Sequence, residues 1–428
     1  MAEIGNTGQV VRLHRPTRRL GGYSGVAAPP QLGLYVHLPW CVRKCPYCDF
    51  NSHEMRDWDR LLPEEEYLRA LERDLDWSLP LVWGRTVQTI FIGGGTPSLF
   101  SAAGIDHLLA SIRARLRLAA DVEITMEANP GTFEIERFRG FAAAGVNRLS
   151  LGVQTFSDRA LQAIGRIHGG AEARGALEQA MRLFPRLNVD LMYALPGQTV
   201  DELERDLDRL KEQGASHWST YQLTLEAGTP FERRPPVLPD ESVEEAMQTL
   251  IEERAAAQGL VRYEVSAWAR EGERCRHNLN YWQFGDYLGI GAGAHGKLSF
   301  HDRIVRHARH RNPRRYMSAL LSPKPTDPSP ATLADLSESL PQAPWIETAQ
   351  KVPATDLPFE FMLNALRLRE GVPASLFAER TGLSLATLSK TIDRAVARGL
   401  MSPDPDRLRA SALGWRHLNG LQALFLTD

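Results

Sequence analysis

Three cysteines lie within eight residues of one another, at Cys41, Cys45 and Cys48, in a C-x3-C-x2-C run that begins where an apolar segment ends. Thiolates are the usual ligands of iron–sulfur clusters, and a four-iron cubane held by three cysteines keeps one iron open to a small molecule. Spacings this short suit a metal centre better than structural disulfides. Zinc is the alternative, because structural zinc sites also use clustered cysteines. Such sites require a fourth protein ligand. Only Cys275 remains in the sequence to supply it.

Other polar residues stand where apolar runs end. Gly93-Gly94-Gly95-Thr96 follows one run, Glu127 ends another, Gln154 ends a third and Asp190 lies within a fourth. Three consecutive glycines let a backbone approach a ligand closely and can present N–H groups to a carboxylate or phosphate. If these runs are parallel strands, their carboxyl ends meet at one rim and bring these residues to the cysteines.

The elements that must position these residues alternate regularly. The expected strands are 33–39, 87–92, 122–127, 148–154, 188–194 and 217–223. The expected helices lie near 64–80, 101–118, 133–144, 158–184 (broken at Gly169-Gly170), 200–213 and 241–258. Alternation of apolar strands with amphipathic helices predicts an α/β fold with a parallel sheet covered by helices, and six units suffice for a partial or complete barrel.

The remaining segments have other compositions. Residues 1–32 carry four arginines among Gly and Pro and predict a flexible basic arm. Residues 301–356 include a stretch rich in Pro, Ser and Ala and predict a linker or insertion. Residues 357–428 predict a helical domain, with helices near 357–369, 373–380 and 384–398. Its charges are mixed, so we expect a packing or lid domain and no nucleic acid as partner.

The overall composition fits a globular protein in a reducing compartment. The 428 residues are 43% hydrophobic and 24% charged, with a net charge of −2. No stretch approaches the roughly 20 apolar residues of a membrane span, and no signal peptide is recognisable. Clustered cysteines also fit a reducing compartment. We therefore expect a cytoplasmic protein without a transmembrane segment; a homodimer stays open.

These features resemble the radical S-adenosylmethionine (SAM) proteins, whose hallmark is C-x3-C-x2-C after the first barrel strand. Residues 35–41 (YVHLPWC), 91–97 (FIGGGTP), 151–156 (LGVQTF) and 190–196 (DLMYALP) are similar to the branch that contains the oxygen-independent coproporphyrinogen III dehydrogenase and a related heme chaperone. The likeness covers 33–300 strongly and the C-terminus more loosely. It implies a partial (β/α)6 TIM-type barrel over 33–300 and a C-terminal winged-helix-like domain.

The resemblance also implies the site. Cys41, Cys45 and Cys48 would hold a [4Fe–4S] cluster whose open iron is chelated by the amino and carboxylate groups of SAM. The residues at positions where the family contacts SAM are Tyr35, Tyr47, Gly94, Gly95, Thr96, Glu127, Gln154, Arg166 and Asp190. An arginine such as Arg166 can pair with a carboxylate in a bidentate way. His37 and Trp40 are expected to pack behind the cluster.

Two features separate the branches of this family. The dehydrogenase carries a further cysteine two positions after the third, where this chain has Phe50. Residues 277–282 (HNLNYW) match the HNxxYW signature of the chaperones, which makes His277, Tyr281 and Trp282 heme candidates; His295 is a second candidate for iron ligation. We therefore expect a heme chaperone that serves apo-hemoproteins, including membrane-bound respiratory enzymes. The alternative is the dehydrogenase itself, so catalysis stays open.

Overall fold

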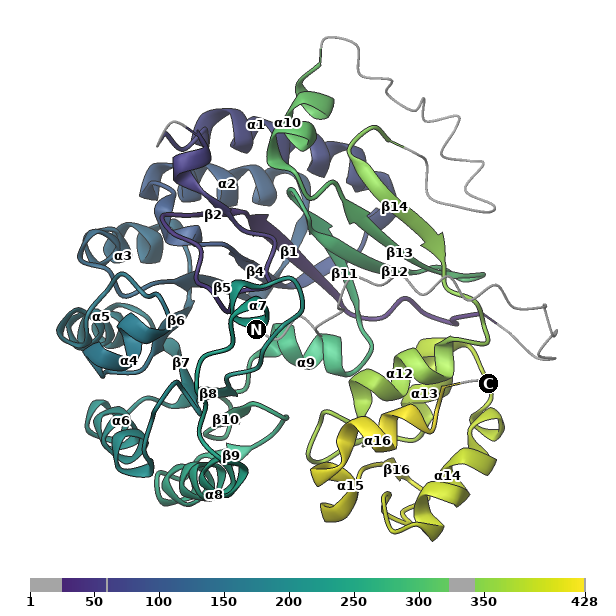
Figure 1. Ribbon diagram of the computed structural model, residues 1–428. Coiled ribbons are helices and arrows are strands. Elements are labelled where there is room, and N and C mark those ends of the chain that lie inside the picture. Colours follow the sequence, from purple (N-terminus) through teal and green to yellow (C-terminus); the bar gives the residue numbers. More distant parts are fainter. Residues whose placement is uncertain (1–24, 59–60, 323–342, 427–428) are drawn as a thin grey trace.

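A computed structural model of the chain describes residues 25–58, 61–322 and 343–426. Its centre is a run of six parallel strands in the order of the sequence, within a sheet of twelve strands (Figure 1). The six strands are β1 (Leu32–Leu38), β4 (Thr86–Gly94), β5 (Arg117–Ala128), β6 (Arg148–Gln154), β7 (Arg186–Tyr193) and β8 (His217–Gln222). The (β/α)6 partial barrel expected from the sequence is confirmed.

Helices cover the outer face of these strands (Figure 1). They are α1 (Glu64–Ser78), α2 (Ala102–Arg115), α3 (Thr132–Ala144), α4 (Asp158–Ala163), α5 (Gly170–Leu183), α6 (Val200–Gln213) and α8 (Glu241–Ala257). Helix α6 shows why the sequence predicts them well. Thr199 and Glu202 close its start as a reciprocal capping box, and the left-handed Gly214 ends it.

The two faces of each strand differ in chemistry. In β6, Leu149, Leu151 and Val153 pack in the core beneath the helices. The alternate residues of the same strand, Arg148 and Ser150, are polar and also buried. Because side chains alternate along a strand, these polar residues lie on the inner face of the curved sheet. The barrel therefore has an apolar shell and a polar lumen.

Short antiparallel strands extend the sheet at both edges. Strands β11 (Asp286–Ile290), β12 (His295–Ser299), β13 (Ile304–Arg309) and β14 (Ile346–Lys351) follow outward from β1. Beyond β8 lie β10 (Ala267–Ala269) and β9 (Val261–Arg262). The β13–β14 pairing and helix α10 (Pro313–Leu321) correct the expectation of a linker over 301–356, since only part of that segment has linker composition. Residues 323–342, which hold the prolines of that expectation, lie outside the described residues.

The C-terminal domain is helical. It contains α12 (Leu357–Ala365), α13 (Ser375–Thr381), α14 (Ser389–Ala397), α15 (Ala412–Arg416) and α16 (Leu418–Ala423), with a small antiparallel ribbon of β15 (Val372–Pro373) and β16 (Arg407–Leu408). Its core also takes in Val26 and Trp282 from outside the domain. Of the expected N-terminal arm, 1–24 lie outside the described residues, while Val26 is 3% exposed because it packs in this core. No helix in the described parts of the chain has the length and apolar character to span a membrane.

Candidate metal and cofactor site

The cysteine-bearing loop follows β1 and is closed at its base. Strand β2 (Trp40–Cys41) pairs in parallel with β3 (His53–Glu54), so the loop leaves and returns at the same place. Within it, the Lys44 ammonium donates to the Phe50 carbonyl over 2.8 Å, and the Lys44 backbone N–H donates to the Glu54 carboxylate over 3.1 Å. These contacts fold the loop compactly around its three thiols.

The thiols themselves are half-buried. Burial raises the pKa of Cys41 to about 12 and raises the pKa of Cys48 as well. Thiolates therefore need a bound cation to form here, as metal ligands do. Among the described residues, no three Cys, His, Asp or Glu side chains converge on one metal ion. A cubane does not require that convergence, because each cysteine binds a different iron.

Cys275 does not complete a zinc site with the other three. It is 1% exposed and packs with Tyr35, Phe91 and Ala294, and its thiol lies 3.7 Å from the Glu123 carboxylate. Glu123 is four residues before Glu127 on β5, or about 13 Å along the strand from the rim. The donor set of the loop thus fits a three-cysteine cluster better than a four-cysteine zinc site.

A chain of polar contacts joins two of the thiols to the strand ends. The Thr96 hydroxyl donates to Cys41 Sγ over 3.5 Å and accepts from the Asn129 amide over 2.9 Å. Arg166 donates to Asn129 Oδ1 over 2.6 Å and lies 3.8 Å from Cys45 Sγ. Residues after β1, β4, β5 and α4 therefore meet around the cysteine loop.

The glycine segment at the end of β4 presents a different polarity from the one expected. The backbone N–H of Gly94 donates to Glu127 Oε2 (3.1 Å), that of Gly95 to the Leu38 carbonyl (2.8 Å) and that of Thr96 to the Trp40 carbonyl (2.7 Å). Because these three N–H groups are engaged within the protein, the backbone of Gly94, Gly95 and Thr96 can offer a ligand carbonyl oxygens but no N–H donors. It suits an ammonium group, whereas the sequence suggested a carboxylate or phosphate.

The ends of β6 and β7 bend sharply. Gln154 and Ala194 adopt positive φ angles of 69° and 55°, a conformation that costs non-glycine residues energy and is concentrated at functional sites. The side chains of Gln154 and Arg166 lie close over the neighbouring Gly152, where a Cβ would stand 3.0 Å from Gln154 Nε2 and 3.2 Å from Arg166 Nη2. The bend thus packs Gln154 beside Arg166.

The other expected SAM contacts lie on β1, on the cysteine loop and on β7. The Tyr35 hydroxyl shares a hydrogen bond of 2.9 Å with His37. The Tyr47 ring lies 6.5 Å from that of Phe231, on α7 (Pro230–Arg233), and burial raises its pKa. Asp190 accepts hydrogen bonds from Ser150 and Asn188 inside the lumen.

The residues expected to pack behind the cluster do so. His37 is 2% exposed, and its Nε2 lies 2.8 Å from the Asn51 carbonyl of the cysteine loop. Trp40 is 1% exposed, with its ring 4.6 Å from that of Tyr67 at 86°.

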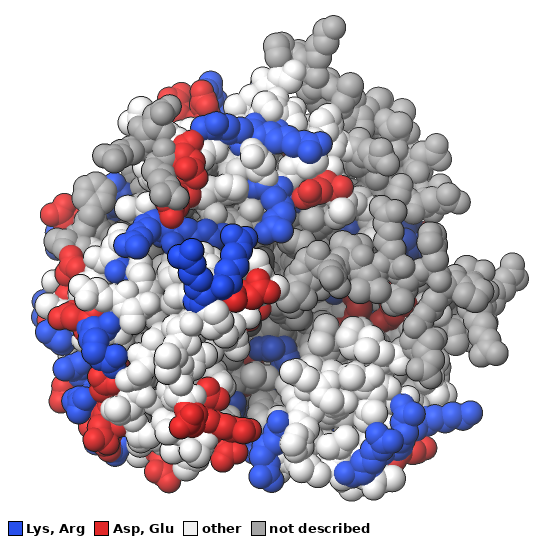
Figure 2. Space-filling view, in the orientation of Figure 1, with Lys and Arg blue, Asp and Glu red and all other residues white. Residues whose placement is uncertain are grey.

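A shallow, open pocket lies against the loop, lined by Cys45, Thr96, Asn129, Arg166 and others. Figure 2 shows Lys and Arg side chains gathered over the middle of this face, the area where β2, β5 and α7 appear in Figure 1. Exposed arginines next to β2 and α7 include Arg43, Arg233 and Arg234. A concentration of positive charge around a pocket attracts anionic ligands.

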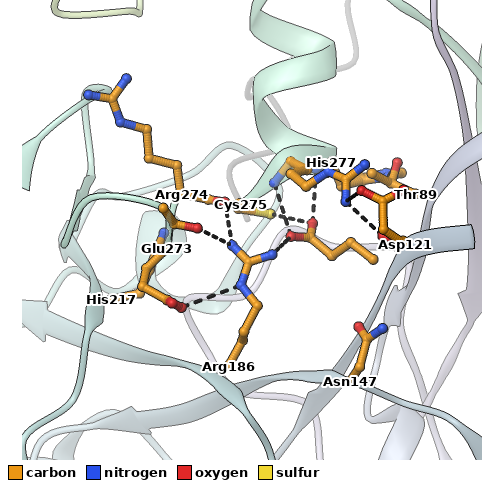
Figure 3. Close-up of polar contacts among 12 residues, drawn as sticks. Thr89, Asp121, Asn147, Arg186, His217, Glu273, Arg274, Cys275 and His277 are labelled. Carbon is orange, nitrogen blue, oxygen red and sulfur yellow. Dashed lines mark hydrogen bonds and ion pairs between the residues drawn. The ribbon is translucent and has the colours of Figure 1, made fainter.

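The opposite end of the lumen is closed by helix α9 (Arg276–Trp282). The Glu123 carboxylate accepts from the N–H groups of Arg276 and His277 and pairs with Arg186 over 2.5 Å. Figure 3 shows Arg186 at the centre of these contacts, beneath Cys275 and His277. An anionic acceptor at a helix N-terminus is stabilising, so Glu123 anchors the helix across the amino ends of the strands.

The heme candidates from the HNxxYW signature lie at this closed end, away from the cysteines. His277 is 0% exposed, and its Nδ1 and Nε2 share hydrogen bonds with Thr89 (2.7 Å) and Tyr281 (2.9 Å). Trp282 faces the C-terminal domain, where the Arg367 guanidinium lies 4.3 Å from its ring. In this conformation neither nitrogen of His277 is open to an iron.

Sequence reasoning missed Asn129 as a site residue and Glu123 as the anchor of α9. Asn129 had a usable signal, because it stands two residues after Glu127 and so extends the same face of the strand. Glu123 had none, since its partners are 63 to 154 residues away in the sequence.

Two protein-family models match this chain, and relatives are similar to it over almost their full length. The radical SAM superfamily model matches residues 35–210, and the HemN C-terminal domain model matches 352–417. The heme chaperone HemW of Escherichia coli (strain K12) is 45% identical over 404 residues, which are 93% of this chain and 99% of that protein. The heme chaperone HemW of Haemophilus influenzae is 41% identical over 408 residues, with the same coverage.

The solved structure of coproporphyrinogen III oxidase (HemN) from Escherichia coli, described as a radical SAM enzyme, is similar over 93% of this chain and 90% of that one. The TM-score is 0.73 and the sequence identity is 21%. At that identity the likeness establishes the fold.

Proposed function

Because this chain belongs to the HemW family of heme chaperones, within the radical SAM superfamily, we propose that it binds heme and passes it to apo-hemoproteins. The observation that carries the proposal is the identity of 45% over 93% of the chain, which includes both the barrel and the C-terminal domain. The likeness to the HemN structure supports the fold, but it does not support any particular activity for this chain. Phe50, in place of a thiol, supports the chaperone over the dehydrogenase.

Membership of the superfamily implies a [4Fe–4S] cluster and SAM as cofactors. Cys41, Cys45 and Cys48 are the residues that would hold the cluster. When bound, the cluster supplies an open iron and an electron source next to SAM. The compact loop, with its thiols protonated until a cation binds, fits that group.

For SAM, the polarity of the rim supports a definite orientation. Carbonyl oxygens of Gly94 and Gly95 would accept from its ammonium group, and Arg166 would face its carboxylate. Tyr35, Tyr47, Thr96, Glu127, Gln154 and Asp190 complete the proposed contacts. Asn129 joins them as the residue that fixes Arg166.

The partners are proposed on the same basis. The heme acceptors would include membrane-bound respiratory enzymes, which a chaperone in the cytoplasm would meet at the membrane surface. A homodimer is a further proposal, which the molecular mass in solution tests.

One preparation can test the function against the dehydrogenase alternative. Anaerobically reconstituted protein is titrated with heme and, in parallel, incubated with coproporphyrinogen III, SAM and a reductant. We expect near-stoichiometric heme binding and no decarboxylated product. Conversion of coproporphyrinogen III without heme binding would overturn the proposal.

A further inference from the structure

A heme chaperone needs an iron ligand that can take heme and release it again. Imidazole is a common axial ligand, and it must have an open nitrogen. In the part of the chain that the structure describes, most histidines are engaged, as His37, His53, His168, His217 and His277 are through ring hydrogen bonds. His107 and His301 lie beside carboxylates. Three have no ring partner among the described residues: His307, which is 2% exposed and so out of reach of a ligand, and the exposed His295 and His417.

His295 lies next to the base of the cysteine loop. It begins strand β12, two residues after Gly293, where a Cβ would collide with the Asn51 amide. Asn51 is three residues beyond Cys48 and also donates to the Arg311 carbonyl over 3.0 Å. The loop therefore contacts the backbone of Arg311 and the turn that precedes His295.

The Arg311 side chain is exposed and electrostatically close to His295. Partial burial lowers the pKa of His295, and the positive charges of Arg306 and then Arg311 add to the shift, although the nearby Glu347 opposes it. Histidine at this position is thus neutral at physiological pH, the form that binds iron. A guanidinium beside a neutral imidazole offers heme both an iron ligand and a partner for a propionate.

The strand neighbours of His295 are small. Ala308 lies directly opposite it on β13, and Thr348 lies opposite Ala308 on β14. On the other side, a Cβ at Gly289 would collide with the His295 carbonyl. Cross-strand partners share a face of the sheet, so the positions directly beside the imidazole on β13 and β14 carry small side chains, while Arg306, Arg311 and Glu347 lie further around it. A planar macrocycle can lie over such a surface. His417 lies in the C-terminal domain, between α15 and α16.

We propose that His295 is the axial ligand of heme, with Arg311 pairing with a propionate, on the sheet surface beside the cysteine loop. This inference rests on the proposed heme-chaperone function. An exposed ligand of this kind suits transfer, because a ligand from an acceptor protein can approach the iron without prior opening of the barrel. The buried His277 offers no such route.

The test is a heme titration of reconstituted protein, followed by the Soret band. His295→Ala should bind heme at least tenfold more weakly and lose the imidazole-ligated spectrum, and added imidazole should restore that spectrum. His417→Ala is the matched control and should behave as the parent. An unchanged spectrum and affinity in His295→Ala would overturn the inference, while failure of the parent to bind heme would overturn the proposed function instead.

The propionate contact has its own test. Arg311→Gln should weaken binding of heme several-fold and leave binding of heme dimethyl ester, which lacks the carboxylates, unchanged. Equal losses for both ligands would exclude the pairing. Circular dichroism and iron content of each variant report whether the fold and the cluster are retained.

Discussion

The guanidinium of Arg166 donates to Asn129 Oδ1 over 2.6 Å, and the same nitrogen donates to the Gly152 carbonyl over 2.7 Å. This relationship joins the residue after α4 to the loop after β5 and the end of β6. It also directs the other terminal nitrogen to Cys45 Sγ, at 3.8 Å. The arginine is therefore fixed before any ligand arrives.

Replacing Arg166 by Lys should weaken SAM binding at least tenfold while the iron content stays at the parental value. An ammonium cannot reproduce the planar fork that holds Asn129 and Gly152 and still face a carboxylate. Equilibrium dialysis with labelled SAM measures the effect. Arg159→Lys is the control, since Arg159 is exposed and pairs with Glu202 away from the pocket. Equal affinities of the two variants would exclude this role for Arg166.

Replacing Cys45 by Ser should abolish the broad visible absorption and most of the iron of anaerobically reconstituted protein. A three-cysteine site cannot lose one thiolate and keep a stable cluster. Cys275→Ser should retain both signals, because Cys275 lies with Glu123 inside the barrel. A four-iron complement in Cys45→Ser would contradict the three-ligand assignment.

Replacing Glu123 by Gln should destabilise the barrel by roughly 3 kcal/mol in urea denaturation, because it leaves buried positive charge uncompensated and weakens the anchor of α9. Glu123 is 2% exposed and pairs with Arg186. Asp121→Asn removes only an ion pair to Arg276 whose carboxylate is 77% exposed. That control should change stability by no more than about 0.5 kcal/mol. Similar losses in both variants would show that Glu123 is not the anchor.

The pH dependence of unfolding should report the buried histidines. Burial lowers the pKa of His277 to about 3, so its contribution is complete above about pH 6.5, the unfolded pKa, and is lost as pH falls toward 3. The free energy of unfolding of the parent should fall between pH 7.5 and pH 5. In His277→Gln this fall should be smaller by roughly 2 kcal/mol, because the variant lacks the histidine that must be kept neutral.

Urea titrations of the apo-protein at both pH values measure this difference. His107→Gln, on the exposed side of α2, serves as the control and should keep the parental pH dependence. The assignment fails if the two variants respond to pH alike.

The sequence predicted the barrel well because its signals are local. Strand β6 and helix α6 have the expected limits, since apolar periodicity, a capping box and a terminal glycine mark them within a few residues. The expected break at Gly169-Gly170 marks the start of α5, where a Cβ at Gly170 would collide with the Phe156 carbonyl, but α4 already ends at Ala163. The rim residues were predicted for the same reason: each follows its own strand.

Elements whose formation or position depends on contacts between distant parts of the sequence could not be predicted. Strands β13 and β14 are recognisable only through their pairing across the segment 323–342. The sequence of the HNxxYW helix does not indicate at which end of the barrel the helix packs. That position depends on contacts of His277 with Glu123 and Thr89, which lie more than 150 residues earlier. The engagement of His277 and the openness of His295 likewise arise only in the folded chain.

The anchoring of α9 also couples the barrel to the C-terminal domain. Trp282, the last residue of α9, packs in the core of that domain, and the Arg367 guanidinium lies over its ring. The first turn of the same helix is held by Glu123 of β5. A displacement of α9 at the amino ends of the strands therefore displaces a residue of the C-terminal core, which makes the helix a mechanical link between the two domains.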